Sequence, residues 1–339
     1  MILGLQSMST PAPVRLIRCA IKRFRYPVAS VGAIVGIPLI LFFIGAGGFR
    51  PVPGFNVWNR PMEIMGGFML FTLLSAGLLM WFTAWLRSSE SLFVDIRSQM
   101  KMEEELDADR FQYGRFWPLA ILLGIAFAVF GNLNTGNLSY NPESEIFFVS
   151  LAISFGQIFM WSTIAVSLFF VFQDDFLLYQ YGRHVSVNIY DLDKLNGFGS
   201  AALSQFLMVV GALVLTTLQS LDRDFQWVNY ANGLYVGIPS AIIFVILPTW
   251  TIRKNIKQEK ARVLASINAE IQLASTGLES ESLLRMNALI ARREQVQHTR
   301  TWPMDISIFS RFLFYIFIPP LAWLGAAMME VLLDSFLAG

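Results

Sequence analysis

Residues 146–172 read IFFVSLAISFGQIFMWSTIAVSLFFVF, a long apolar run without a charged side chain. A helix rises about 1.5 Å per residue, so about 20 residues cross a hydrocarbon core of roughly 30 Å. This run is therefore long enough to span a membrane. Six further apolar stretches qualify as spans: 28–47, 64–86, 117–133, 199–219, 232–251 and 308–333.

The composition agrees with a membrane protein. Hydrophobic residues make up 55% and charged residues 14% of the 339 residues, whereas soluble domains average about 25% charged residues. The net charge of +1 gives no argument for a nucleic acid or an acidic partner. We therefore predict an all-α, polytopic membrane protein with about seven transmembrane helices and no nucleic-acid partner.

The positions of the basic residues predict the orientation of the chain. Of the 25 Lys and Arg residues, 21 fall in four alternate segments between the apolar stretches: 1–27, 87–116, 173–198 and 252–305. Because cytoplasmic segments carry an excess of Lys and Arg, we expect the amino terminus in the cytoplasm and the carboxyl terminus outside. Residues 28–47 exceed the usual length of a signal-peptide core, so we expect a retained helix. Compact loops and a single cysteine fit a bacterial inner membrane.

This topology divides the chain into four parts. Residues 1–27 hold a cytoplasmic, basic amphipathic helix, and residues 28–251 form a six-helix transmembrane region with short loops. Residues 252–305 are expected as a cytoplasmic, antiparallel helical hairpin, and residues 306–339 as a last transmembrane segment that prolines break.

The amino-terminal helix has one apolar and one basic face. The apolar face is formed by Val14, Ile17, Ile21 and Phe24. The neighbouring basic face is formed by Arg15, Arg18, Lys22 and Arg25. Such a helix is expected to lie on the anionic inner leaflet of the bilayer. A simpler interpretation is an anchor that fixes orientation and has no further role.

Residues 252–300 predict two amphipathic helices on either side of Ser275-Thr276-Gly277. The chain must return from the first helix to the last span, which requires an antiparallel hairpin. The apolar stripes include Ile267 and Ile271 in the first helix and Leu283 and Leu289 in the second. These stripes either cover each other within one chain or serve assembly with further copies or with a membrane partner protein.

Small residues indicate close helix contacts within the membrane. Gly32 and Gly36 in the first span, and Gly124 and Ala128 in the third, lie four residues apart, a spacing that lets helix backbones approach. Such contacts occur both within a chain and between chains. Gly32 and Gly36 are therefore candidate assembly residues.

The last apolar segment is interrupted by Pro319 and Pro320. Two missing amide donors must kink or break a helix, and broken helices in membranes are tolerated where protein or a water-filled cavity covers the freed carbonyl groups. Glu330 and Asp334 follow. Either both acids reach the outer interface, or Glu330 lines an aqueous path that attracts cations.

The sequence predicts no catalytic, cofactor-binding or metal-binding residues. The first six spans contain no ionisable residue, so coupled transport is not expected, and polar residues such as Gln205 are expected to form interhelical hydrogen bonds. Neither a phosphate-binding loop nor a dinucleotide fingerprint is present. Asp191 and Asp193 only superficially offer a metal-binding pair. In the cytoplasmic segment 173–198, the alternating run 184–189 is expected to form a short strand or an extended stretch against the membrane surface.

Two functions fit these features. The first is an oligomeric channel or passive conduit, with the last segment near the pathway and the cytoplasmic hairpin used for assembly or gating. The second is a non-catalytic membrane scaffold or accessory subunit that presents the hairpin to a partner protein. No enzymatic activity is expected for either.

Overall fold

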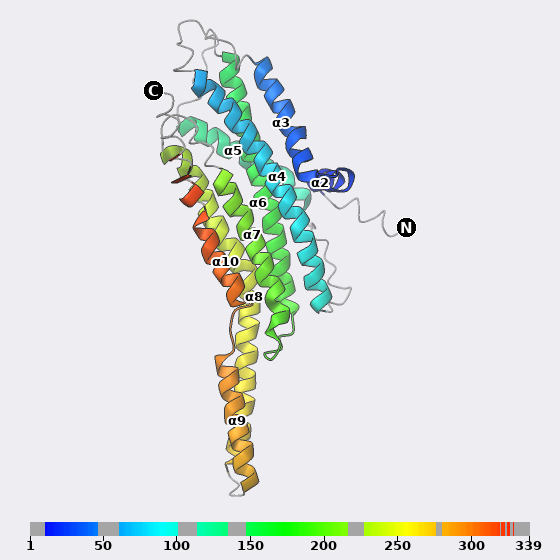
Figure 1. Ribbon diagram of the computed structural model, residues 1–339, viewed down its shortest axis with the longest axis vertical. Helices are drawn as coiled ribbons and strands as arrows, with labels where there is room; N and C mark the ends of the chain where they lie inside the picture. Colours follow the sequence, from blue (N-terminus) through cyan, green and yellow to red (C-terminus); the bar gives the residue numbers. More distant parts are fainter. Residues whose placement is uncertain are drawn as a thin grey trace.

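The computed structural model describes residues 11–46, 61–100, 114–134, 147–215, 227–275, 280–318, 320–322, 324, 325 and 328. All regular elements in these residues are helical, which confirms the predicted all-α class (Figure 1). The α-helices are α2 (Ala12–Arg23), α3 (Pro27–Gly45), α4 (Pro61–Met100), α5 (Trp117–Asn134), α6 (Phe147–His184), α7 (Asn196–Leu215), α8 (Trp227–Ala274), α9 (Ser280–His298) and α10 (Ile306–Ile316). Short 3-10 helices, η3 (Gly114–Phe116) and η4 (Leu192–Leu195), precede α5 and α7.

Among the described residues, four helical segments are long and apolar enough to cross a membrane: Pro27–Gly45, Ser154–His184, Leu192–Leu215 and Leu234–Ala274. They overlap four of the predicted spans. Apolar side chains on the outer faces of α3 and α5, such as Ile37, Leu41 and Leu123, are more than half exposed. Exposure of this kind suits contact with lipid.

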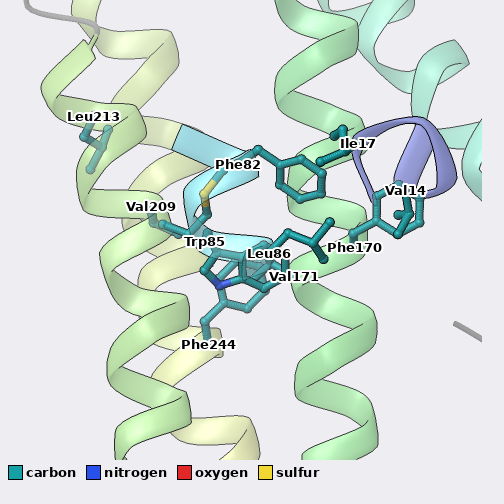
Figure 2. Close-up of a cluster of buried hydrophobic side chains, with 11 residues drawn as sticks. Val14, Ile17, Phe82, Trp85, Leu86, Phe170, Val171, Val209, Leu213 and Phe244 are labelled. Carbon is teal, nitrogen blue, oxygen red and sulfur yellow. The ribbon is translucent and has the colours of Figure 1, made fainter. Parts of the chain in front are cut away.

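Helices α4, α6, α7 and α8 form the centre of the molecule. Each of α4 and α8 contacts both α6 and α7. Together with α2, these four helices form the first apolar cluster (Figure 2): Val14, Ile17, Phe82, Trp85, Leu86, Phe170, Val171, Met208, Val209, Leu213 and Phe244. With η4 they also form the second apolar cluster: Phe93, Ile96, Leu177, Leu178, Tyr181, Leu192, Leu195, Phe198, Ala201, Ile252 and Ile256.

Helices α3 and α5 pack on the outside of this bundle, against α4 and α6 respectively. Gly32 and Gly36 allow the contact of α3, because a Cβ atom at Gly32 would collide with Met80 and one at Gly36 would lie 3.6 Å from the Cβ of Ala76. The structure therefore uses both candidate assembly glycines within the chain. Gly124 allows an even closer approach of α5 to the backbone of α6.

Helix α2 begins with Pro13 in its first turn, where the missing amide costs nothing. Its Val14 and Ile17 are buried in the first apolar cluster, so this part of its apolar face packs on protein. Arg18 forms a 2.7 Å ion pair with Glu90 of α4. Arg15, Lys22 and Arg25 are exposed and remain available to an anionic surface.

Helix α8 extends beyond the bundle and carries α9 alongside it (Figure 1). We call residues 253–274 of α8 together with α9 the arm. The two helices run antiparallel, since Lys260 Nζ donates to the carbonyl oxygens of Gln297 and Thr299 at 2.6 and 3.0 Å. The apolar contact in the arm comprises Val263, Leu264, Ile267, Ile271, Leu289 and Val296, with Ile189 from the segment after α6.

Helix α10 begins at Ile306, at the start of the predicted last segment. Pro303 precedes it, and Asp305 is its N-cap residue, accepting a 2.6 Å hydrogen bond from the amide of Ile306. Arg300 fixes this entry by donating to Asp193 at 2.9 Å and to Asn196 at 3.0 Å. The regular helix ends at Ile316, and helical backbone recurs at Ile318 and in residues 320–322.

Replacing Asp305 with alanine should destabilise the start of α10 by about 0.5–2 kcal/mol, the usual cost of losing an N-cap side chain. Faster amide hydrogen exchange at the start of α10 would report this loss. Asp305→Asn is the matched control, because asparagine caps about as well as aspartate without the charge. Equal exchange rates in the two variants would contradict a capping role.

Candidate functional site

The most unusual part of the molecule lies between the first and the second apolar cluster. In α4, residues 87–92 separate members of the first cluster from members of the second. Residues 172–176 of α6, 202–207 of α7 and 245–251 of α8 occupy the same position in their helices. These four helices contact one another, so the four intervals form one level of the bundle.

Buried polar side chains occupy this level. We call them the polar layer: Ser89, Gln173, Asp174, Asp175, Gln205 and Thr249. Both aspartates and Thr249 are 0% exposed, and Gln205 is 2% exposed. Residues three or four apart share a helix face, and Asp175 is thus in line with Val171 of the first cluster and Leu178 of the second. Its side chain belongs to the core-facing stripe of α6.

Two members of the polar layer are satisfied within their own helices. Ser89 donates to the carbonyl oxygen of Leu86 at 3.1 Å, and Thr249 donates to that of Val245 at 2.7 Å. Asp175 differs, because none of the described residues donates a hydrogen bond to either of its carboxylate oxygens. The same holds for Oε1 of Gln205, and both polar atoms of the Gln173 amide also have no partner there.

An unpartnered carboxylate at this depth carries a large free-energy cost. Desolvating a polar group without a compensating hydrogen bond costs roughly 2–7 kcal/mol, and an isolated charge costs more. Buried ionisable residues of membrane proteins therefore mark functional sites by default. The polar layer, with the unpartnered carboxyl group of Asp175, is the candidate functional site of this chain.

Close contacts hold α6 and α8 together next to the layer. Gly182 lies against Thr251 and Ile252 of α8. Its carbonyl oxygen accepts a 2.8 Å hydrogen bond from Nδ2 of Asn255, and the hydroxyl of Thr251 donates to the carbonyl oxygen of Tyr179 at 3.4 Å. The helices that supply Asp175 and Thr249 are thus fixed relative to each other.

Helix α6 extends beyond the end of the predicted span 146–172. Residues 173–184 continue α6 as buried helix, because Leu177, Leu178 and Tyr181 extend its apolar face into the second cluster. Residues 185–188 after His184 have no regular structure, and no strand occurs in this described segment. Asp191 forms a 2.5 Å ion pair with Lys194, and Asp193 forms a 2.9 Å ion pair with Arg300.

The arm brings only some of the candidate assembly residues together. Ile267 and Leu289 are 2% and 7% exposed in the contact between α8 and α9, and Ile271 packs against them. Leu283, by contrast, is 53% exposed on the outside of the arm. Leu284 and Ile290 are also exposed there, at 71% and 44%. The outer side of α9 therefore carries an apolar surface that α8 does not cover.

Of the four candidate pathway residues, only Pro320 is among the described residues. Pro320 lines a groove of about 1010 Å³ between α10 and the pair α7 and α8. Pro319, Glu330 and Asp334 lie outside the described residues. The groove is lined by apolar side chains except near its Arg300 and Asp305 end. Its walls suit hydrocarbon better than ions.

The chain matches no protein family, no curated protein and no solved structure. The described residues contain no group of three or more His, Cys, Asp or Glu side chains placed to hold a metal ion. Arguments about function therefore rest on the polar layer and on the arm.

Proposed function

We propose that this chain is a non-catalytic scaffold or accessory subunit of the bacterial inner membrane. In this proposal it crosses the membrane about seven times with a cytoplasmic amino terminus, and the arm is a cytoplasmic helical hairpin. The excess of Lys and Arg in alternate segments supports this orientation. The exposed apolar side chains of α9 carry the proposal, because a partner that covers them removes apolar surface from water.

The charges of the arm indicate the chemistry of its partner. Residues 253–298 contain eight Lys or Arg and five Asp or Glu, so the arm is net basic. Its helix in α8 continues to Ala274, about 33 Å beyond Ile252 at 1.5 Å per residue. This length exceeds the Debye length of about 8 Å several times, so membrane charge is screened at the tip. The proposed partner is a protein with an acidic, partly apolar surface.

Photocrosslinking in native membranes tests this proposal. A photoreactive amino acid at Leu284 should give an adduct with one defined second protein, whereas the same amino acid at Asn268, exposed on α8, should not. An adduct of twice the mass of the chain would instead show that the arm joins copies of this protein. Lack of any adduct from Leu284 would contradict a role of this surface in binding.

Leu284→Asp should abolish the copurification of the partner, because a charge replaces an exposed side chain of the apolar surface. A loss of affinity of tenfold or more, about 1.4 kcal/mol, is expected. Asn268→Asp introduces the same charge at an exposed position of α8 and should leave binding unchanged. Equal loss of the partner in both variants would mean that an added negative charge anywhere on the arm releases the partner, and that this apolar surface does not bind it.

An oligomeric channel or conduit is the second candidate function, and the polar layer is the observation that favours it. An uncompensated carboxylate within a membrane bundle attracts cations. Purified protein in liposomes would then pass monovalent cations. Flux no greater than that of protein-free liposomes would exclude this function and leave the scaffold proposal unaffected.

A further inference from the structure

The carboxyl group of Asp175 has no hydrogen-bond donor and no positive counterpart among the described residues. No ion pair joins Asp175 to a Lys or Arg among them. Arg87, the basic residue of α4 at this level, is exposed on the outside of the bundle. Farther along, Arg97 donates to the hydroxyl of Tyr181 at 2.9 Å, and the guanidinium of Arg253 in α8 lies 4.2 Å from the ring centre of Trp302. Asp174, the neighbouring carboxylate, adds negative potential at the same level of the bundle.

Other oxygen atoms of the polar layer are free to act as ligands. Oε1 of Gln205 has no donor. Thr249 gives its hydroxyl hydrogen to the carbonyl oxygen of Val245, which leaves the lone pairs of Oγ1 available. Pro248 has no amide hydrogen to give to the carbonyl oxygen of Phe244 four residues earlier, so α8 frees a backbone acceptor beside the layer. Freed carbonyl groups in membrane helices commonly coordinate Na⁺.

We propose that the polar layer binds one Na⁺ ion, with Asp175 as the anionic ligand and neutral oxygens from α7 and α8 completing the site. Oxygen-only ligands select hard cations. One uncompensated carboxylate balances one positive charge. A divalent ion is disfavoured because the described residues hold no cluster of three acidic side chains. This site does not depend on what the arm binds.

Binding to the folded state raises thermal stability in proportion to the logarithm of ligand concentration once the site is near saturation. The melting temperature of the purified full-length protein should therefore rise with NaCl. It should not rise with N-methylglucamine chloride at the same ionic strength. This comparison separates site binding from the general screening effect of salt.

Variants assign the Na⁺ response to the layer. Asp175→Asn should abolish it, whereas Asp95→Asn, an exposed aspartate on α4, should keep the wild-type response. Thr249→Val removes one neutral ligand of the same size. It should require about fivefold more Na⁺ for half of the melting shift, the factor expected for one contact of hydrogen-bond strength.

Three results would overturn the proposal. A melting temperature of the wild-type protein that changes with pH but not with Na⁺ would mean that the carboxyl group of Asp175 holds a proton instead. A wild-type Na⁺ response in Asp175→Asn would place the ion elsewhere. If Asp175→Asn does not fold, Thr249→Val decides. A Na⁺ concentration for half of the melting shift that equals that of the wild type would also place the ion outside the polar layer.

Discussion

Gly124→Leu should leave little folded protein, because α5 cannot then pack against α6. A Cβ atom at Gly124 would lie 2.5 Å from the Cα atom of Ser162 and 2.8 Å from the carbonyl oxygen of Trp161. These are backbone atoms, so relief requires moving a whole helix. Overpacking a core typically costs about 1–3 kcal/mol, and a backbone collision places this variant at the upper end of that range or beyond it.

Two measurements on detergent-solubilised protein test this substitution. They are the height of the monodisperse peak in size-exclusion chromatography and the melting temperature. The matched control is Ala126→Leu, which adds a similar side chain at an exposed position of the same helix. We expect the control to resemble the wild type. If both variants gave the same yield and melting temperature, the close approach of α5 and α6 would be wrong.

Leu289→Asp should open the arm while the bundle stays folded. Leu289 is 7% exposed among Val263, Ile267 and Val296, so the new carboxylate would have to be buried in an apolar contact without a partner. Such burial costs several kcal/mol. The same apolar contact joins α9 to α8, so α9 should detach from α8.

Limited trypsin digestion measures this opening at Arg285, Arg292 and Arg293. When opening and closing are fast, cleavage follows the population of the open form, so each 1.4 kcal/mol lost should increase the rate about tenfold. Leu284→Asp carries the same substitution at a 71% exposed position and should digest like the wild type. Slow cleavage of Leu289→Asp would contradict the packing of α9 on α8.

The burial of Leu283 and Leu289 shows how far the sequence predicted the arm. Periodicity predicted two helices with an interruption near Ser275; in the structure α8 ends at Ala274 and α9 begins at Ser280. Periodicity also placed Leu283 and Leu289 on one stripe. Their burial differs because two helices in contact cover only a narrow seam, and a sequence pattern does not state which edge of a broad stripe lies in that seam.

The polar layer was missed for a different reason. Hydropathy falls after Phe172, but α6 continues to His184 because its buried apolar residues recur with helical spacing through Tyr181. Hydropathy reports where the chain leaves lipid, whereas packing determines where a helix ends. Asp174 and Asp175 were therefore expected in the cytoplasmic segment that follows the span. Only the position of four helices relative to one another shows that both are fully buried.

The sequence identified Gln205 as a polar residue within a span but assigned it an interhelical hydrogen bond. In the structure its Oε1 has no donor among the described residues. The pair Gly32 and Gly36 shows the same limit of a prediction from sequence, which does not name the contact partner. Gly32 and Gly36 signalled a close contact, and the structure places that contact on α4 of the same chain.

Because α8 is continuous from the bundle to the end of the arm, it can transmit movement between them as a rigid rod. One helix of 48 residues runs from the bundle, past Thr249 and Ile252, to the far end of the arm at Ala274. Tilting its outer part by about 5° at Ile252 moves Ala274 by roughly 3 Å, since the intervening turns extend about 33 Å. A change in the packing around Asp175 would thus be amplified mechanically at the arm tip. Force applied at the tip would in turn act on the polar layer.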